Sequence, residues 1–302
     1  MVRLVSALGV GLALLAAFAW AVQYLALRLG TDGGSIRELM VVTLCCNVVI
    51  AVPVVAVFFE PTVELTARSL AAFAAAGIVG SLFGRLLLYG SVDVVGASRT
   101  APVVASSTLF ATGFALPLLG ERISAVHAAG VVLVVAGISV VSWETAADAD
   151  GERSLRSVGR AVVLPLGSAV LLGLEPIFVA WGLAEGTPAV TGFAVTAVAA
   201  SVGFLVFLLA RGDVPTRRLY RHSNRFWYAV SGLASTTGLL TYFFALDVAP
   251  VSVVVPVSQI SPLLVVVLSA LFLPRRLERV TWRLAAAACV VVVGTVIVST
   301  AT

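Results

Sequence analysis

The chain has 302 residues, of which 60% are hydrophobic and 11% are charged, and its mean hydropathy is +1.10. About a quarter of the residues of a soluble domain are charged, so this composition excludes a soluble globular protein and indicates a polytopic membrane protein. The net charge of +4 comes from arginine, because the chain has no lysine. The arginines lie in short loops between apolar segments, and we expect no nucleic-acid partner.

Apolar segments of about twenty residues follow one another along the chain, and each can cross a hydrocarbon core of about 30 Å as a helix. We predict spans at residues 5–27, 37–58, 69–90, 97–119, 123–143, 160–184, 188–210, 226–246, 250–273 and 281–300. The expected fold class is therefore an all-α membrane protein with ten transmembrane helices. Cys45, Cys46 and Cys289 have no metal-binding or redox spacing, and we expect no cofactor and no metal.

The arginines also predict the orientation of the chain. Most of them lie in the loops that follow the odd-numbered spans, whereas the loops on the other side hold Arg3, Arg68 and Arg122. By the positive-inside rule, the loops after odd-numbered spans face the cytoplasm and both termini lie outside. We expect a multi-pass protein of the cytoplasmic membrane of a prokaryote.

The two halves of the chain match each other at a nearly constant offset. DVVGASRTAP at 93 resembles DVAPVSVVVP at 247, and ERIS at 121 and GISVVS at 137 resemble ERVT at 278 and GTVIVS at 294. We predict a first five-helix repeat at 1–143, a polar linker at 144–159 and a second repeat at 160–302. Because five crossings is an odd number, the second repeat enters the membrane from the opposite side. Inverted repeats place a site near the membrane midplane, in a central cavity that can open to either side.

Several short motifs carry a resemblance to a known family. They are LLGERIS at 118–124, the following Gly130 and Gly137, Pro102 and Pro256 in the fourth and ninth spans, and Trp20 in the first. With these motifs the chain resembles the drug/metabolite transporter superfamily, of the EamA-like type with ten helices. The resemblance implies a secondary transporter of small metabolites, often an exporter, with helices around a central cavity. The second copy, PRRLERVT, departs from the pattern because it lacks the glycine before Glu278.

Glu175 is the leading candidate for transport chemistry, because an isolated charge within an apolar span usually faces a cavity or a partner. Ser168, Glu175 and Gly182 recur at seven-residue spacing, which predicts a stripe that lines a polar cavity. Pro176 removes a backbone donor and permits a kink. One interpretation makes Glu175 a proton or cation site, as its place in the first helix of a repeat resembles a glutamate of the four-helix multidrug branch. The other is a protonated carboxyl group bonded to backbone beside the kink. Repeat one has Trp20 at the aligned position.

Arg85 is the second candidate, four residues after Ser81 and four before Tyr89. It either faces the cavity or an acidic partner, or extends to the membrane interface as long arginine side chains can. If Arg85 and Glu175 meet, both stay charged, and a bound anion would compete for the arginine.

The remaining candidates are polar or aromatic side chains within spans. Gln259 lies between Pro256 and Pro262, and Tyr242 ends a stripe with Ser231, Ser235 and Gly238. The candidate substrate or proton ligands are Glu175, Arg85, Gln259, Tyr242, Gln23, Trp20 and Asn47, and the candidate kink or gating prolines are Pro176, Pro102, Pro256 and Pro262. Each has an alternative as an ordinary packing residue between membrane helices.

Four acidic residues near predicted span ends have a structural interpretation. Asp93 and Asp247, which correspond in the two repeats, are expected to cap the helices that follow them, and Glu121 and Glu278 likewise resemble caps at helix starts.

The function predicted is secondary transport of a small molecule across the bilayer by alternating access, by a monomer or a homodimer. An enzyme is not expected, because no paired carboxylates or metal spacing occur and His127 and His222 lie near interfaces or loops. A membrane scaffold or a lipid-handling protein is the remaining alternative. No phosphate-binding loop for ATP-driven pumping is present.

Overall fold

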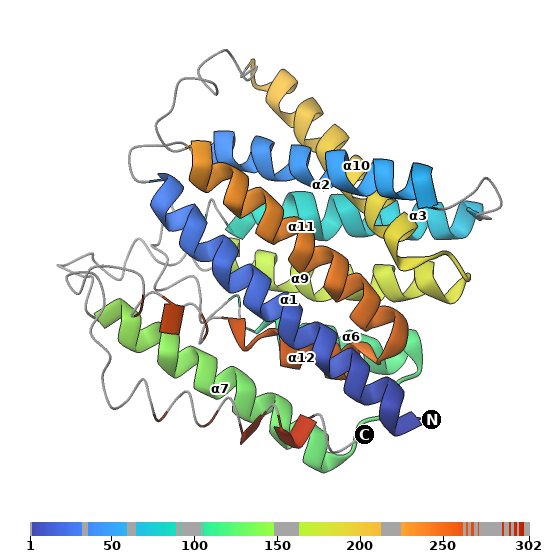
Figure 1. Ribbon diagram of the computed structural model, residues 1–302. Helices are drawn as coiled ribbons and strands as arrows, with labels where there is room; N and C mark the ends of the chain where they lie inside the picture. The colour runs from blue at the N-terminus through green and yellow to red at the C-terminus, as the bar shows by residue number, and fades with distance from the viewer. Residues whose placement is uncertain are drawn as a thin grey trace.

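The computed structural model describes residues 2–31, 36–58, 65–88, 91, 104, 106–147, 163–212, 225–261 and some positions between 264 and 298. All regular secondary structure within these residues is helical (Figure 1). The elements are α1 (Val2–Thr31), α2 (Ile36–Phe58), α3 (Ala67–Ala76), the π-helix η1 (Gly77–Gly84), α6 (Ser107–Leu119), α7 (Ala125–Ala147), α9 (Val163–Ala184), α10 (Ala189–Ala210), α11 (Arg225–Val248) and α12 (Val251–Ser258).

Six of the predicted spans are confirmed as helices long and apolar enough to cross a membrane. They are Ala7–Leu27, Arg37–Val57, Ala67–Leu88, Val163–Ala184, Ala189–Ala210 and Arg225–Val248. In the fourth and ninth predicted spans, the described helices α6 and α12 have 13 and 8 residues. The apolar part of α7, Ala125–Gly137, is also short. The total of ten helices therefore stays a prediction.

Large apolar side chains on the outer faces of these helices are exposed. Val57, Val163 and Phe226 have exposed fractions of 73%, 67% and 64%. Surfaces of this kind are stable against lipid tails and costly in water. The exposure therefore agrees with a multi-pass membrane protein.

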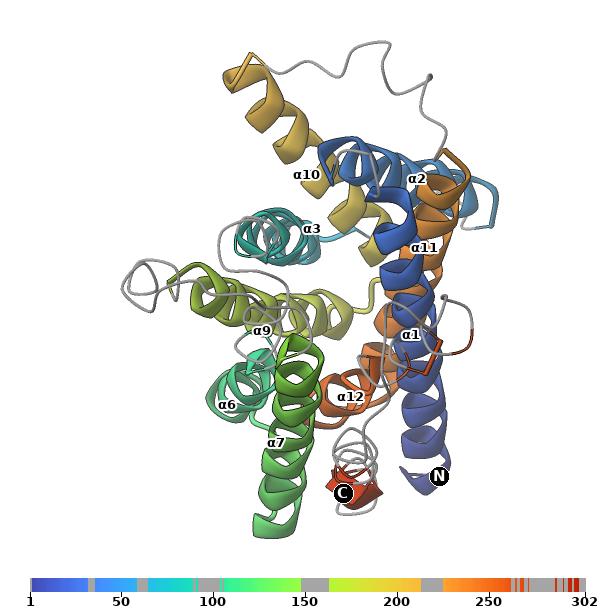
Figure 2. The same ribbon diagram turned by 90° about the vertical axis from the view of Figure 1, so that its left-hand side faces the viewer.

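The first helix, α1, lies antiparallel against α11 (Figures 1 and 2). A side chain at Gly9 would meet Ala249, one at Gly238 would meet Trp20, and one at Gly30 would meet Tyr228. Residue numbers thus rise along one helix as they fall along the other. Glycine at these crossings lets the helices approach closely.

The helix α9 has the same relation to α3 and η1. Phe73 packs against Gly182, Gly80 against Glu175, and Leu87 against Gly167. The first helix of each predicted repeat therefore lies antiparallel against the third helix of the other repeat. The second helices, α2 and α10, also contact each other, as do α6 and α12. Each half of the chain thus buries its helices mainly against the other half.

Left-handed glycines follow the ends of α6, α9 and α10, the last at Gly212 with φ 68°. Gly120 has φ 69° and its amide donates to the carbonyl of Ala115, and Gly186 after α9 has φ 81°. Only glycine adopts this conformation without strain. The glycine of the LLGERIS motif is thus explained as the residue that ends α6.

Candidate functional site

Glu175 lies in α9 and is 8% exposed. The Ser81 hydroxyl donates a hydrogen bond of 2.6 Å to its Oε1 atom. Gly80 lies directly against the Glu175 side chain, so any side chain at position 80 would collide with it. The carboxyl group is therefore held between a hydroxyl donor and a glycine of η1, which belongs to the other half of the chain.

The π-helix η1 brings Gly80 and Ser81 to this position. The Arg85 amide donates to the carbonyl of Gly80, five residues earlier, which is the hydrogen bond that defines a π turn. Gly77 and Gly84 let this segment approach α10 and α9, because side chains there would meet the Thr196 backbone and Leu172. Short π segments within α-helices occur often at functional sites.

Arg85 follows η1 and is half-buried. Its positive charge interacts favourably with the carboxyl group of Glu175. Within the described residues, however, no hydrogen bond or ion pair joins the two side chains. The structure thus places Arg85 beside the Glu175 site rather than in direct contact with it.

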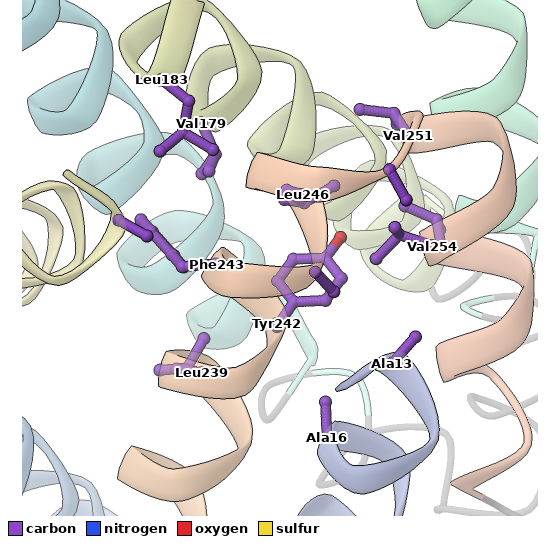
Figure 3. Packing of buried hydrophobic residues seen from close by; sticks show 14 of the residues in the cluster. Ala13, Ala16, Val179, Leu183, Leu239, Tyr242, Phe243, Leu246, Val251 and Val254 are labelled. Carbon is purple, nitrogen blue, oxygen red and sulfur yellow. The ribbon is translucent and has the colours of Figure 1, made fainter. Parts of the chain in front are cut away.

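Tyr242 of α11 and Trp20 of α1 form an aromatic pair. Their ring centroids are 5.3 Å apart, and the Trp20 indole packs against Gly238. Tyr242 is buried and interacts electrostatically with Glu175. Its ring lies among Leu246 of α11, Val254 of α12 and Ala13 of α1 (Figure 3). Tyr242 therefore interacts with both Glu175 and Trp20.

The two helix crossings around Tyr242 are related by the internal repeat but differ in chemistry. In one crossing Glu175 of α9 packs against Gly80, and in the other the aligned Trp20 of α1 packs against Gly238. The acid thus occurs once and the indole once. An asymmetric pair of this kind gives the site one charged side and one aromatic side.

The predicted stripe Ser168, Glu175 and Gly182 shares one buried face of α9. Ser168 donates 2.9 Å to the carbonyl of Gly84, Glu175 accepts from the Ser81 hydroxyl, and Gly182 packs against Phe73. The polar residues thus find partners across a close helix contact. The role of the stripe as a cavity lining stays a prediction.

The other candidates lie in separate contacts. Asn47 Oδ1 accepts 2.8 Å from Thr236 between α2 and α11, and Gln259 Nε2 donates 3.3 Å to the Ser107 hydroxyl. Gln23 is buried in α1. Within the described residues, no hydrogen bond joins any of these amides to Glu175. Their role as ligands stays a prediction.

Two of the candidate prolines lie within helices, and two cannot be placed. Pro176 and Pro256 are buried inside α9 and α12, whereas Pro102 and Pro262 lie outside the described residues. Because Pro176 has no amide hydrogen, the carbonyl of Leu172 loses its helical partner.

Of the expected caps that can be checked, Asp247 was wrong, whereas Glu121 does cap a helix start. Asp247 is exposed within the last turn of α11, and the amides at the start of α12 bond to Glu121 instead. Glu121 therefore caps α12 rather than its own helix α7, whose first turn is capped by Ser124. Asp93 and Glu278 lie outside the described residues. His127, expected near an interface or a loop, lies in the first turn of α7 and is 1% exposed.

The described residues contain no group of three or more His, Cys, Asp or Glu side chains arranged to hold a metal ion. Sequence reasoning also missed the partner of Glu175. The sequence relates Ser81 only to Arg85, by their four-residue spacing. The π turn that brings Ser81 to α9 has no simple sequence signal beyond its three glycines.

A family model matches the chain twice, over residues 7–143 and again over residues 159–300. The chain belongs to the EamA-like transporter family. Its architecture is therefore that of a two-repeat membrane transporter of the drug/metabolite superfamily. One solved crystal structure has the same fold, with a TM-score of 0.78 and 16% sequence identity over 96% of this chain and 95% of that chain. No curated protein sequence matches this chain closely.

Proposed function

We propose that this EamA-like protein is a secondary transporter that exports a small metabolite across the cytoplasmic membrane by alternating access between two inverted repeats. The antiparallel pairs α1 with α11 and α9 with η1 support the inversion, because the first and third helices of one repeat cross in the same direction. Each repeat can then rock against the other around the site between them.

We further propose that Glu175 exchanges a proton for the substrate during this cycle. The observation that carries the proposal is the buried contact of Glu175 with Ser81, with Arg85 and Tyr242 close enough for electrostatic interaction. Burial disfavours a charged carboxylate, whereas a nearby arginine favours it. A group held between these opposing influences can bind and release a proton when the surrounding helices move.

The substrate must be found before flux can be measured. A thermal-shift screen with separate pools of amino acids, nucleotide sugars and organic cations identifies a solute that stabilises the purified protein. Proteoliposomes with an internal pH dye then report proton movement when that solute is added. We expect solute-dependent proton flux in the wild type and none in Glu175→Gln.

Glu185→Gln is the matched control, because Glu185 follows the same helix but is exposed, and glutamine keeps a side-chain oxygen that accepts from the Thr66 hydroxyl. This variant should keep the wild-type flux. Equal flux in Glu175→Gln and the wild type would exclude Glu175 from coupling and favour the interpretation as a buried structural carboxyl group. Solute uptake without any proton movement would retain transport and reject proton coupling.

A further inference from the structure

The carboxylate of Glu121 joins the two halves of the chain. Glu121 lies in the loop between α6 and α7, and it accepts hydrogen bonds from two amides at the start of α12. The Val251 amide donates 2.8 Å to Oε1, and the Ser252 amide donates 3.0 Å to Oε2. Both carboxylate oxygens thus bind backbone that is 130 residues away in the sequence.

The His127 side chain holds the same residue from its other side. Its Nε2 atom lies 2.8 Å from the carbonyl oxygen of Ser252, inside the protein. Because a carbonyl only accepts hydrogen bonds, Nε2 is the donor. In an α-helix this carbonyl would bond to the amide four residues later, but that residue is Pro256, which has no amide hydrogen. His127 therefore supplies the hydrogen bond that Pro256 cannot.

The helix held in this way is a wall of the candidate site. All eight residues of α12 are buried, and the helix packs against α1, α6, α9 and α11. Figure 3 shows Val254 of α12 near the Tyr242 ring. Any displacement of α12 would therefore change the surroundings of Tyr242.

Two further hydrogen bonds between the halves lie near the ends of predicted spans, as Glu121 does. The Trp181 indole donates 3.3 Å to the carbonyl of Leu118, and the Thr66 hydroxyl donates 3.2 Å to Glu185. These residues and Glu121 adjoin loops that follow even-numbered predicted spans, so all would lie on one side of the membrane. It is the side opposite the arginine-rich loops.

We propose that Glu121 and His127 are positioning residues that form a latch between the repeats and keep α12 closed over this side of the site. The inference rests on the alternating access proposed above. Opening this side separates α12 from the first repeat and leaves two amides and one carbonyl without partners. Hydrogen bonds to a charged carboxylate contribute net stability even when water can replace the partner, so the latch favours the closed arrangement.

Distance measurements between spin labels test the latch directly. The three native cysteines are first replaced. Nitroxides are then attached at Ala125→Cys, at the start of α7, and at Asp247→Cys, near the end of α11, because both positions are exposed. The protein is reconstituted in liposomes, and the label-to-label distance distribution is recorded. In Glu121→Gln, an amide group replaces one acceptor, and we expect the long-distance population to rise about tenfold, which corresponds to about 1.4 kcal/mol.

Histidine variants separate the latch from a general loss of stability. His127→Leu should also shift the distribution toward long distances, whereas His127→Gln keeps an amide donor and should shift it less. Pro256→Ala restores an amide hydrogen for the Ser252 carbonyl within α12 but no bond to the first repeat, so we expect it to recover thermal stability in His127→Leu and to leave the distance shift in place. A merely structural role of His127 predicts that the distances recover as well.

Arg122→Gln is the matched control, because it removes a neighbouring exposed charge and should leave the distances unchanged. Wild-type distributions in both Glu121→Gln and His127→Leu would overturn the latch, as would equal shifts in Arg122→Gln. These measurements need neither substrate nor proton, so their failure leaves the Glu175 flux test unaffected. If the distance shifts occur as expected but Glu175→Gln has the same proton flux as the wild type, only the proposed role of Glu175 is rejected.

Discussion

Substitution of Gly80 by alanine tests the contact that defines the candidate site. A Cβ atom at position 80 would collide with Cβ, Cδ and Oε2 of Glu175. Because the Glu175 Cβ is attached to the backbone of α9, a rotamer change alone cannot relieve the collision. The two helices must separate by on the order of 1 Å to restore ordinary contacts of about 3.5 Å.

The cost of Gly80→Ala has two contributions. Overpacking of this kind costs about 1–3 kcal/mol, and loss of the Ser81 to Glu175 hydrogen bond adds about 1 kcal/mol. The opposing gain in helix propensity from alanine is at most about 1 kcal/mol. We therefore expect a net destabilisation of about 2 kcal/mol, with the largest structural change at Glu175.

The assay is thermal unfolding of the purified protein in detergent, followed by tryptophan fluorescence. Gly11→Ala is the control, because a Cβ at this exposed α1 position meets nothing within 4 Å, and it should melt at or above the wild-type temperature. In a Glu175→Gly background, Gly80→Ala should cost less, since the colliding atoms are absent. Equal melting temperatures for Gly80→Ala and Gly11→Ala would refute the close contact.

Substitutions that probe three further contacts are tested by the same melting assay. Ser81→Ala should lower stability by about 1 kcal/mol, and Ser81→Thr, which keeps the hydroxyl, should lower it less; equal losses would show that the hydroxyl contributes nothing. Thr236→Val should cost about 0.6 kcal/mol. In an Asn47→Ala background it should cost less, because the hydroxyl then donates only to the Gly232 carbonyl; equal losses in the two backgrounds would contradict the bond to Asn47. Gly173→Val should cost about 1–3 kcal/mol, because a Cβ there lies 2.7 Å from the Phe110 Cβ, and an unchanged melting temperature would contradict the tight crossing of α6 and α9.

The candidate site shows where sequence reasoning succeeds and where it ends. Glu175 was predicted as a site residue because a carboxyl group ten residues inside an apolar span is costly unless it faces a cavity or a partner. The structure does bury it. Its partner Ser81 and the contact with Gly80 could not be read from spacing. They depend on a π turn, which shifts the register of side chains by one residue relative to the α-helix expected there.

Asp247 does not cap the helix that follows it, and Glu121 caps α12 instead of α7, for a related physical reason. Asp247 and Glu121 each stand a few residues before a predicted helix, and a local rule assigns each to the helix that follows it. An amide at a helix start donates to any nearby oxygen, however distant in the sequence. In the folded chain the nearest oxygens for Val251 and Ser252 belong to Glu121 of the other half.

The sequence by itself determined that the chain is a membrane protein built of apolar helices in two related halves, because hydropathy, span length and internal similarity are properties of consecutive residues. Only the tertiary structure decided that each half buries its helices against the other, that Ser81 bonds to Glu175 while Arg85 and Tyr242 interact with it electrostatically, and that Tyr242 packs against Trp20. Side chains from distant segments meet only after helices pack, and glycine positions set how closely they can do so.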